Sequence, residues 1–259
     1  MNFEAVKKRL CAAGIENATG EAAMLCEVFK EAELEAAVTR RCHHYPLQYI
    51  LGKWAFYREE YEVNENCLIP RSDTEILVDL AIHMLPNGAR FLDICTGSGC
   101  IAVSTLKNRT DTVGIGIDLF KETLALATKN AASNGVADRF TPLLADATKA
   151  PPTMLSAYAF DAILSNPPYI ESKVLSTLQE EVKFEPHAAL DGGADGLLFY
   201  RLILKNWGHL LKKDGFILFE IGYDQAAALQ TISAQYGYTC TVKKDLGGHD
   251  RVCILHSTK

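Results

Sequence analysis

The segment Asn166-Pro-Pro-Tyr169 carries the groups best suited to chemistry in this sequence, and it follows the apolar run Phe160–Ser165. Pro167 and Pro168 fix φ and keep the segment extended at a low entropic cost. The side-chain carbonyl of Asn166 and the backbone carbonyl of Pro167 then form two fixed acceptors, which suit the two hydrogens of a planar –NH2 group. The Tyr169 ring can stack on the plane that carries this group. The segment therefore predicts a site for an amide or arylamine nitrogen.

A second candidate site begins at the apolar run Phe91–Ile94, which ends in the small-residue turn Cys95-Thr-Gly-Ser-Gly99. Glycines let the backbone approach a ligand closely, and the N–H groups that open the following helix point outward. Asp118 ends the next apolar run. Its carboxylate can accept hydrogen bonds from both hydroxyls of a ribose. These features predict a nucleoside cofactor.

Two observations favour S-adenosylmethionine as this cofactor. Asp93 precedes the glycines, where a carboxylate repels a pyrophosphate but suits an ammonium group and a sulfonium. The chain also ends in a predicted antiparallel hairpin, as Rossmann-like methyltransferases do. Asp146-Ala147 can offer a carboxylate to an adenine amino group and an N–H to its ring. However, Gly97-Ser-Gly-Cys-Ile-Ala102 also fits the dinucleotide fingerprint G-x-G-x-x-G/A, so a nicotinamide or flavin oxidoreductase is an alternative.

An amide nitrogen is a weak nucleophile because its lone pair is delocalised. Hydrogen bonds from its N–H groups to Asn166 and to the Pro167 carbonyl would hold it in line with a sulfonium methyl. These bonds would strengthen as positive charge develops on the nitrogen. Positioning alone can supply ~7–11 kcal/mol in favourable cases. We expect no strong general base, because the proton leaves after the methyl has arrived.

From Arg90 onward, apolar runs alternate with segments of helical periodicity. The predicted strands are Phe91–Ile94, Val113–Asp118, Phe140–Asp146, Asp161–Ser165, Phe216–Ile221, Tyr238–Lys243 and Val252–Leu255. The predicted helices follow Gly99 and cover Lys121–Asn134, Leu197–Leu211 and Gln225–Tyr236. This alternation predicts the α/β class, with a largely parallel seven-stranded sheet and helices on both faces. Only a short loop joins the last two strands, so they must pair antiparallel, because a parallel crossover needs about a dozen residues.

The region before this sheet predicts two further parts. Residues 1–45 read as a small N-terminal helical domain with two short helices in the first forty residues. Residues 46–70 read as a linker that contains a β-hairpin, with a turn marked by Asn64 and Asn66. The remaining domain, 71–259, opens on a helix whose N-terminus carries a capping box at Ser72-Asp-Thr-Glu75.

The composition excludes several classes of protein. With 259 residues, of which 48% are hydrophobic and 22% charged, the chain excludes a disordered, collagen-like or coiled-coil protein. The net charge of −6 weighs against a partner bound through nucleic-acid phosphates. The 8 cysteines include no Cys-x-x-Cys pair, so we expect reduced thiols and no metal site. The sequence shows no signal peptide or membrane span, and we expect a cytoplasmic monomer.

Several motifs together resemble the HemK/PrmC family, the glutamine-N5 methyltransferases that act on peptide chain release factors. The matching stretches are Pro46–Gly52 with Phe56, Leu68–Glu75, Asp93–Gly99, Asn166–Tyr169, parts of Glu185–Leu197, and Lys244–Arg251. They extend from about residue 46 to the C-terminus. The Asn-Pro-Pro-Tyr motif alone is shared with amino-methyltransferases of DNA and RNA, whereas the combination is not.

The resemblance implies that the acceptor is the side-chain amide of the glutamine in the Gly-Gly-Gln tip of a release factor. It implies that S-adenosylmethionine is the methyl donor, that S-adenosylhomocysteine is the product, and that the helical domain helps dock the factor. It also places Asn166 near the cofactor. The predicted catalytic residues are Asn166, Pro167, Pro168 and Tyr169. The predicted cofactor-binding residues are Asp93, Cys95, Thr96, Gly97, Ser98, Gly99, Asp118, Asp146, Ala147 and Asn166.

The sequence departs from the family pattern in a few places. The N-terminal helical region is shorter than is usual, Ser72 replaces a proline, and Cys95 stands where many members have glycine. Ala147 falls near a position that is often bulkier. Arg71 and Glu75 are further candidates for contact with cofactor or substrate.

Two other acceptors would use the same chemistry. One is the amino group of adenine or guanine in DNA or RNA, which the acidic charge and the lack of a separate basic domain disfavour. The other is a glutamine of a ribosomal protein. The leading prediction is therefore an S-adenosylmethionine-dependent protein-glutamine methyltransferase, with these two acceptors as alternatives.

Overall fold

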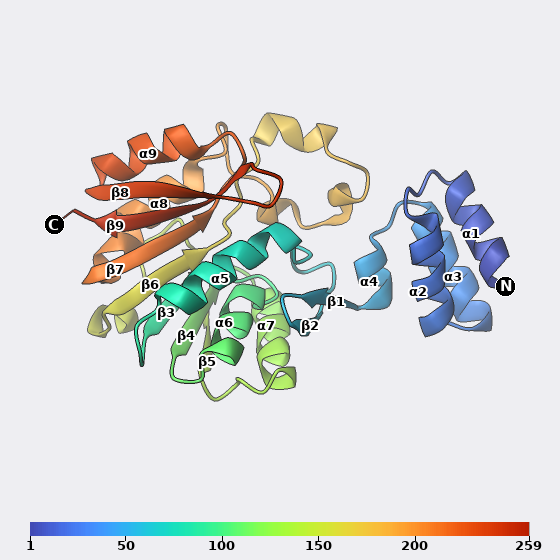
Figure 1. Cartoon of the computed structure of the whole chain (residues 1–259), viewed down its shortest axis with the longest axis horizontal. Coiled ribbons are helices and arrows are strands. Elements are labelled where there is room, and N and C mark those ends of the chain that lie inside the picture. Colours follow the sequence, from blue (N-terminus) through green and yellow to red (C-terminus); the bar gives the residue numbers. More distant parts are fainter. Residues whose placement is uncertain (259) are drawn as a thin grey trace.

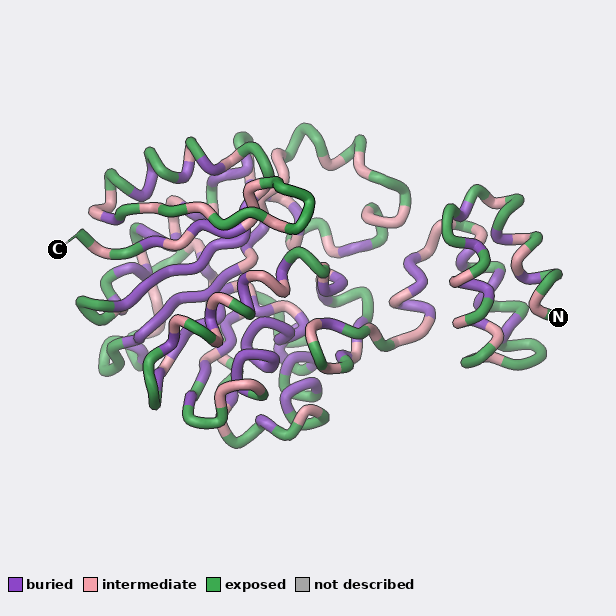
Figure 2. The backbone as a smooth tube through the Cα atoms, viewed as in Figure 1, coloured by how far each residue is buried: buried purple, intermediate pink, exposed green. Residues whose placement is uncertain are grey.

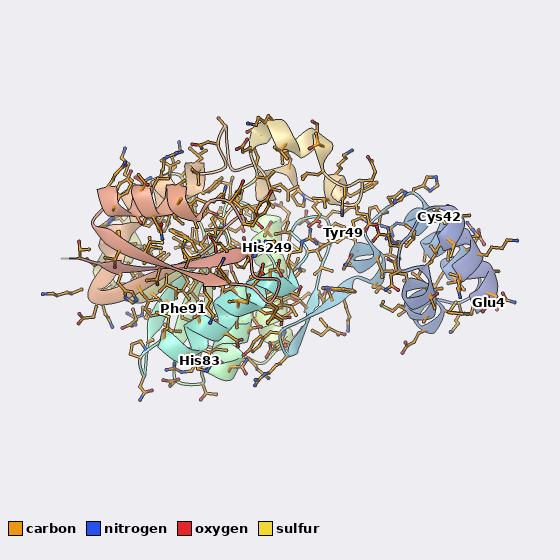
Figure 3. The ribbon with its side chains drawn as sticks, turned by 45° about the horizontal axis from the view of Figure 1, so that its top comes forward. Glu4, Cys42, Tyr49, His83, Phe91 and His249 are labelled. Atoms are coloured by element: carbon orange, nitrogen blue, oxygen red, sulfur yellow. The ribbon has the colours of Figure 1, made fainter. Side chains whose placement is uncertain are left out.

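The computed structural model describes residues 1–258. It contains an N-terminal group of helices, a small two-stranded sheet, and a seven-stranded sheet flanked by helices (Figure 1). Figure 3 labels Cys42 in the N-terminal helices, Tyr49 in the connection and Phe91 in the large sheet. No helix among the described residues is long and apolar enough to cross a membrane.

The large sheet confirms the predicted α/β class. Its strands are β3 (Arg90–Ile94), β4 (Val113–Asp118), β5 (Phe140–Leu144), β6 (Phe160–Ser165), β7 (Leu211–Glu220), β8 (Tyr238–Lys244) and β9 (Asp250–Ser257). They lie in the order β5-β4-β3-β6-β7-β9-β8. All neighbours pair in parallel except β9, which is antiparallel to both β7 and β8. The antiparallel hairpin at the end of the chain is thus confirmed.

Helices cover both faces of this sheet because its central strands are apolar on both sides. The helices are α5 (Glu75–Met84), α6 (Cys100–Asn108), α7 (Lys121–Ser133), α8 (Leu198–Trp207) and α9 (Ala226–Gln235). Residues of α5, α6 and α7 share one core with Leu218, and residues of α8 and α9 share the other with its neighbour Phe219. Figure 2 shows the buried strands between these two layers.

The N-terminal helices α1 (Phe3–Ala12), α2 (Ala18–Val28) and α3 (Glu31–Cys42) form a core of their own, which we call the N-terminal lobe. The prediction of two helices here is wrong, because it omits α3. This helix buries only Leu34, Ala37, Val38 and the cation of Arg41. Its apolar periodicity is therefore too weak to identify it from the sequence.

The linker combines a short helix, α4 (Leu47–Leu51), with the hairpin of β1 (Lys53–Phe56) and β2 (Glu59–Glu62). The hairpin is confirmed, but its turn lies at Tyr57-Arg58 and not at Asn64 and Asn66. Tyr57 adopts a φ of 59°, and its N–H donates to a Glu75 carboxylate oxygen at 2.8 Å. Tyrosine is not a turn residue, so a tertiary contact stabilises a turn that the sequence does not signal.

The predicted capping box is wrong in detail. Ser72–Thr74 form a 3-10 turn, and α5 begins only at Glu75, without a side-chain hydrogen bond from its N-cap. The Glu75 carboxylate accepts from the backbone of Tyr57 instead. The helix itself is present, because its apolar face packs on the sheet.

A long connection between β6 and α8 contains short 3-10 turns at Ser172–Thr177, Val182–Phe184 and His187–Ala189, and an isolated β-bridge between Ile170 and Asp191. We call residues 170–197 the strap. Figure 1 shows it arching from the sheet toward the N-terminal lobe. Buried Arg41 of α3 pairs with Glu181 of the strap at 2.6 Å. Two other 3-10 turns are Thr153–Ala157 and Gly208–Leu210.

Candidate functional site

A cavity of about 330 Å³ opens at the carboxyl ends of β3, β4, β5 and β6. Open α/β sheets bind their ligands at this edge, which we call the carboxyl edge. The predicted residues that line the cavity are Cys95, Thr96, Gly97, Ser98, Asp118, Asp146, Ala147, Asn166 and Pro168. The predicted residues outside the lining are Asp93, Gly99, Pro167 and Tyr169.

The turn after β3 owes its shape to Cys95, Gly97 and Gly99, which all have positive φ. A Cβ on Gly97 would meet no atom within 4 Å, whereas one on Gly99 would lie 3.2 Å from the Cβ of Ala127. Gly97 therefore exposes backbone to a ligand, and Gly99 permits close packing of α6 and α7. Cys95 takes the same left-handed backbone with a side chain, and burial raises the pKa of its thiol well above the usual value. That thiol is poorly nucleophilic.

Asp93 supports this turn from below. Its Oδ2 accepts hydrogen bonds from Thr96 Oγ1 at 2.6 Å and from the Ala102 N–H at 3.2 Å. Its Oδ1 is buried and has no partner within residues 1–258. Burial raises the pKa of the side chain to about 7. An unpartnered carboxylate oxygen next to a turn that lines the cavity favours a cationic group nearby.

Asp118 lies beside the same turn at the end of β4. Its Oδ2 accepts from the Gly97 N–H at 3.0 Å, and its Oδ1 from the Phe120 N–H at 3.3 Å. Burial raises the pKa of this carboxyl. Each oxygen keeps a second lone pair, so the carboxylate can still accept from the two hydroxyls of a ribose.

Asp146 already has a structural partner, because its Oδ1 accepts from the Thr148 N–H at 2.8 Å and from the Thr148 hydroxyl at 2.6 Å. Its other carboxylate oxygen is available to an amino group. The neighbouring Ala147 carbonyl accepts from the Trp207 indole at 2.9 Å, which holds this backbone in place. Asp146 is therefore a turn cap that also faces the cavity.

The two acceptors predicted in Asn166-Pro-Pro-Tyr169 are both unpaired. Asn166 Nδ2 donates to Thr74 Oγ1 at 3.2 Å, and no donor of the described chain reaches Asn166 Oδ1. No hydrogen bond from residues 1–258 reaches the Pro167 carbonyl either. Both carbonyls therefore lack a donor among residues 1–258; Asn166 lines the cavity, and the buried Pro167 lies between Asn166 and Pro168, which both line it.

Tyr169 makes contacts through both its backbone carbonyl and its side-chain hydroxyl. Its carbonyl accepts from Gln225 Nε2 at 2.9 Å, and its hydroxyl lies 3.4 Å from Glu220 Oε1. Burial raises the pKa of this phenol above its usual value. These contacts hold the end of the segment that presents Asn166.

The sequence prediction omitted Thr74, Phe120 and Glu220. Thr74 and Phe120 line the cavity, but their residue types carry no signal of their own. Glu220 did have a signal, since it is a carboxylate at the carboxyl end of a buried strand, as Asp118 is. Of the two further candidates, Arg71 lines the cavity and Glu75 contacts Tyr57 instead.

The strap closes one side of the cavity with Pro186, Ala188 and Ala189. The buried Glu185 fastens it, because this carboxylate accepts from the Ile69 N–H at 3.0 Å and pairs with Arg71. A second cavity of about 260 Å³ lies between the linker and the strap and shares Arg71 with the first.

Comparisons with known sequences agree with this arrangement. The methyltransferase small domain family model matches residues 73–193. A release factor glutamine methyltransferase from Thermodesulfovibrio yellowstonii is 39% identical over 239 residues, covering 87% of this chain and 81% of the relative. Another of that name from Caulobacter vibrioides is 37% identical over 275 residues, covering 97% and 94%.

Solved structures give the same fold at lower identity. The hMettl16 catalytic domain, solved with an RNA hairpin, has a TM-score of 0.61 and 14% identity, covering 88% of this chain and 79% of that one. A methyltransferase from Pyrococcus furiosus has a TM-score of 0.56 and 16% identity, covering 76% and 88%. At this identity the likeness concerns the fold alone.

Proposed function

The chain belongs to the family of release factor glutamine methyltransferases, and we propose on this basis that it transfers a methyl group from S-adenosylmethionine to a release factor. The acceptor is the side-chain amide nitrogen of the glutamine in the factor's Gly-Gly-Gln motif. The observation that carries this proposal is the pair of unpaired acceptors, Asn166 Oδ1 and the Pro167 carbonyl, beside the cavity. Two carbonyl acceptors on adjacent residues suit the two hydrogens of a primary amide.

The residues around the cavity fit S-adenosylmethionine. When bound, this cofactor supplies an electrophilic methyl group on a positively charged sulfur. Asp118 would hold the ribose hydroxyls, Asp146 the adenine amino group, and the exposed backbone of Gly97 the adjoining part of the molecule. The unpartnered oxygen of Asp93, one of the residues that hold the turn, would add negative charge near a cationic ligand. The carboxylate of Asp93 would repel the pyrophosphate of a dinucleotide, which disfavours the oxidoreductase alternative.

The acceptor residues act by positioning and by selective stabilisation. Asn166 and the Pro167 carbonyl hold both hydrogens of the amide, so its nitrogen can face the methyl group. Both hydrogen bonds strengthen as positive charge grows on the nitrogen, which lowers the barrier more than it tightens substrate binding. The methylated nitrogen is strongly acidic and loses its proton without a strong base. Tyr169, anchored by Gln225, keeps the segment in place.

The proposal includes the parts of the chain outside the site. We assign residues 1–45 to a helical domain that helps dock the release factor, 46–70 to a linker, and 71–259 to the methyltransferase domain. The N-terminal lobe has its own core, which supports a separate unit. A cytoplasmic location and a monomeric state stay predictions.

The test is peptide mass spectrometry after incubation of the protein with S-adenosylmethionine and an unmethylated release factor. We expect one methyl group on the glutamine of the Gly-Gly-Gln motif and none on a Gly-Gly-Ala version of the same factor. Ribosomal proteins, RNA and DNA serve as parallel acceptors. Transfer to one of these and none to the factor would replace the proposed acceptor.

A further inference from the structure

We infer that Asn130 of α7 is a positioning residue for the cofactor, because its single amide group holds two different walls of the cavity. Residues of the linker between Asn66 and Arg71 form one wall, and residues of the turn between Cys95 and Ser98 form another. Asn130 itself is not among the residues that line the cavity. The inference deepens the proposed function and rests on it.

The amide of Asn130 is bonded to both walls. Its Nδ2 donates to the Ser98 carbonyl at 2.8 Å and to the Glu62 carbonyl at 3.0 Å. Its Oδ1 accepts from the Glu62 N–H at 2.8 Å. The residue is 0% exposed, so water does not compete for these bonds. Because both amide hydrogens and the carbonyl are engaged, the side chain has one orientation only.

The orientation of the Ser98 carbonyl depends on this contact. Its partner in a regular helix would be the Ala102 N–H, which donates to Asp93 at 3.2 Å instead. Within residues 1–258, the bond from Asn130 is the only hydrogen bond that reaches this carbonyl. Gly99 follows with a φ of 82°, and glycine resists rotation of the peptide unit less than other residues do. Asn130 therefore fixes the peptide unit that ends the turn.

The linker is held by three side chains at α7, of which Asn130 is one. Thr123 Oγ1 donates to the Asn66 carbonyl at 2.7 Å, and Asn134 Nδ2 donates to the Glu60 carbonyl at 3.1 Å. These three residues lie seven and four positions apart, which puts them on one face of a helix. In the part of the chain that the structure describes, only Asn130 of the three is also bonded to the turn.

Loss of this amide would leave three buried groups without their partners, namely the Ser98 carbonyl and the N–H and carbonyl of Glu62. Such groups are costly, so the turn and the linker would shift to satisfy them. A cofactor that fills the cavity touches both walls, and restoring their arrangement would then reduce its affinity. The acceptors at Asn166 and Pro167 follow a different strand, β6, so the rate with bound cofactor should change less.

The test is Asn130→Ala, titrated calorimetrically with S-adenosylhomocysteine, which binds without reacting. We expect the Kd to rise on the order of 10-fold, the amount by which one ordinary hydrogen bond shifts an equilibrium. The kcat at saturating S-adenosylmethionine should fall much less than the KM for this cofactor rises. The Tm should fall as well, but lower stability alone leaves the Kd of the folded protein unchanged well below the Tm.

The matched control is Asn134→Ala, one helical turn further along. Asn134 Nδ2 donates to the Glu60 carbonyl and to the Asn130 carbonyl at 3.0 Å, so this variant also loses hydrogen bonds between helix and linker. The bond from Asn130 to the turn remains. Its Kd and kcat should therefore match those of the wild type. An equal rise in Kd in both variants would show that any loosening of the linker has this effect, and the inference would be wrong.

A measurement on the wild-type protein decides the question should Asn130→Ala not fold. Binding of S-adenosylhomocysteine should slow the hydrogen exchange of the Glu62 N–H, although Glu62 does not line the cavity. The reference is the Tyr57 N–H of the same hairpin, which a Glu75 carboxylate oxygen accepts at 2.8 Å. Its exchange rate should not change. No slowing at Glu62, or equal slowing at both amides, overturns the inference.

The outcomes separate this inference from the proposed function. If the wild-type protein binds neither S-adenosylmethionine nor S-adenosylhomocysteine, the proposed cofactor fails. If it binds them but does not methylate the release factor, the proposed acceptor fails, and the Kd values still decide the role of Asn130. If Asn130→Ala keeps the wild-type Kd, or loses kcat with an unchanged Kd, the positioning role is wrong.

Discussion

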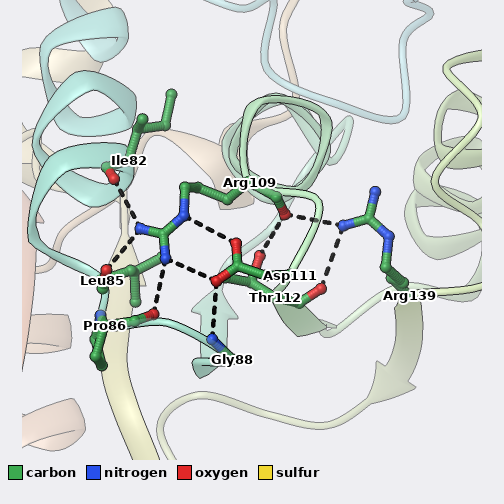
Figure 4. A network of polar contacts seen from close by, with 8 residues as sticks. All are labelled: Ile82, Leu85, Pro86, Gly88, Arg109, Asp111, Thr112 and Arg139. Carbon is green, nitrogen blue, oxygen red and sulfur yellow. Dashed lines mark hydrogen bonds and ion pairs between the residues drawn. The ribbon is translucent and has the colours of Figure 1, made fainter.

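At the amino ends of β3 and β4, every donor of the Arg109 guanidinium has an acceptor. At the carboxyl ends of β3 and β7, by contrast, two buried carboxylates each keep an oxygen without a hydrogen-bond partner among residues 1–258. Figure 4 shows the first of these regions. Arg109 binds the carbonyls of Ile82, Leu85 and Pro86 and both carboxylate oxygens of Asp111.

This difference indicates that the amino ends of the strands serve stability and the carboxyl ends serve ligand binding. Hydrogen bonds from Arg109 and from the Gly88 N–H lower the pKa of Asp111, so its charge is stabilised. At the carboxyl edge, burial raises the pKa of Asp93 and of Glu220 to about 7. Groups that lack partners in the folded chain lower its stability but are ready to bind a ligand. Variants at the two edges should therefore change different quantities.

The largest effect should come from Asn166→Ala. It removes one of the two acceptors that stabilise the charge growing on the amide nitrogen, a loss of ~3 kcal/mol, or on the order of 100-fold in kcat. The Kd of S-adenosylmethionine should change much less, since Asp118 and the turn at Gly97 remain. Steady-state kinetics and calorimetric titration measure the two quantities. Near-normal turnover would remove Asn166 from the acceptor site.

A substitution at the amino ends of the strands should change the stability of the fold and leave the activity unchanged. Arg109→Met keeps the aliphatic stem but leaves the carbonyls of Ile82, Leu85 and Pro86 without their donor, at a cost of about 2 kcal/mol. For a chain of this size the Tm should fall by roughly 4–8 °C. The kcat of the folded variant at 20–25 °C, an ordinary assay range, should equal that of the wild type. A selective loss of kcat would contradict the division between the two edges.

Some features of this molecule can be predicted from the sequence, and others cannot. The strands that end at Ile94, Asp118 and Ser165 were predictable because buried parallel strands are continuous apolar runs. The acceptors of Asn166 and Pro167 were predictable because they depend on residue type within one short segment.

The remaining features depend on contacts between distant segments. The turn at Tyr57 is stabilised by Glu75, and the strap is held by the pairing of Glu185 with Arg71. Glu220 meets Tyr169 only because β6 and β7 are neighbours in the sheet. No periodicity within any one of these segments encodes such a pairing, so pattern reasoning does not find it.

Asp118→Ala should affect the cofactor and not the chemistry. It removes the predicted acceptor for the ribose hydroxyls and also the acceptor for the Gly97 N–H. We expect the Kd of S-adenosylmethionine to rise about 10-fold, which corresponds to about 1.4 kcal/mol. The kcat at saturating cofactor should fall much less. An unchanged Kd in calorimetric titration would rule out the ribose role.

Asp93→Asn should give the smallest effect, and its sign is the sharpest test of the contrast between the edges. The pKa of Asp93 is about 7 in the folded chain against an ordinary 3.8. The folded state therefore binds a proton more tightly than the unfolded state does. Stability from the neutral form is fully present below pH 3.8 and is lost as the pH rises to about 7.

Asparagine is neutral throughout this range, so Asp93→Asn should remove that part of the pH dependence and raise stability at pH 8. The new –NH2 group would take the place of the unpartnered oxygen and lack an acceptor, which limits the gain to about 1 kcal/mol. Affinity for S-adenosylmethionine should fall at the same time, because the charge beneath the turn is gone. Thermal unfolding at pH 6 and pH 8, with cofactor titration, measures both. A variant less stable than the wild type at pH 8 would show that Asp93 is retained for its bonds to Thr96 and Ala102 and not for its charge.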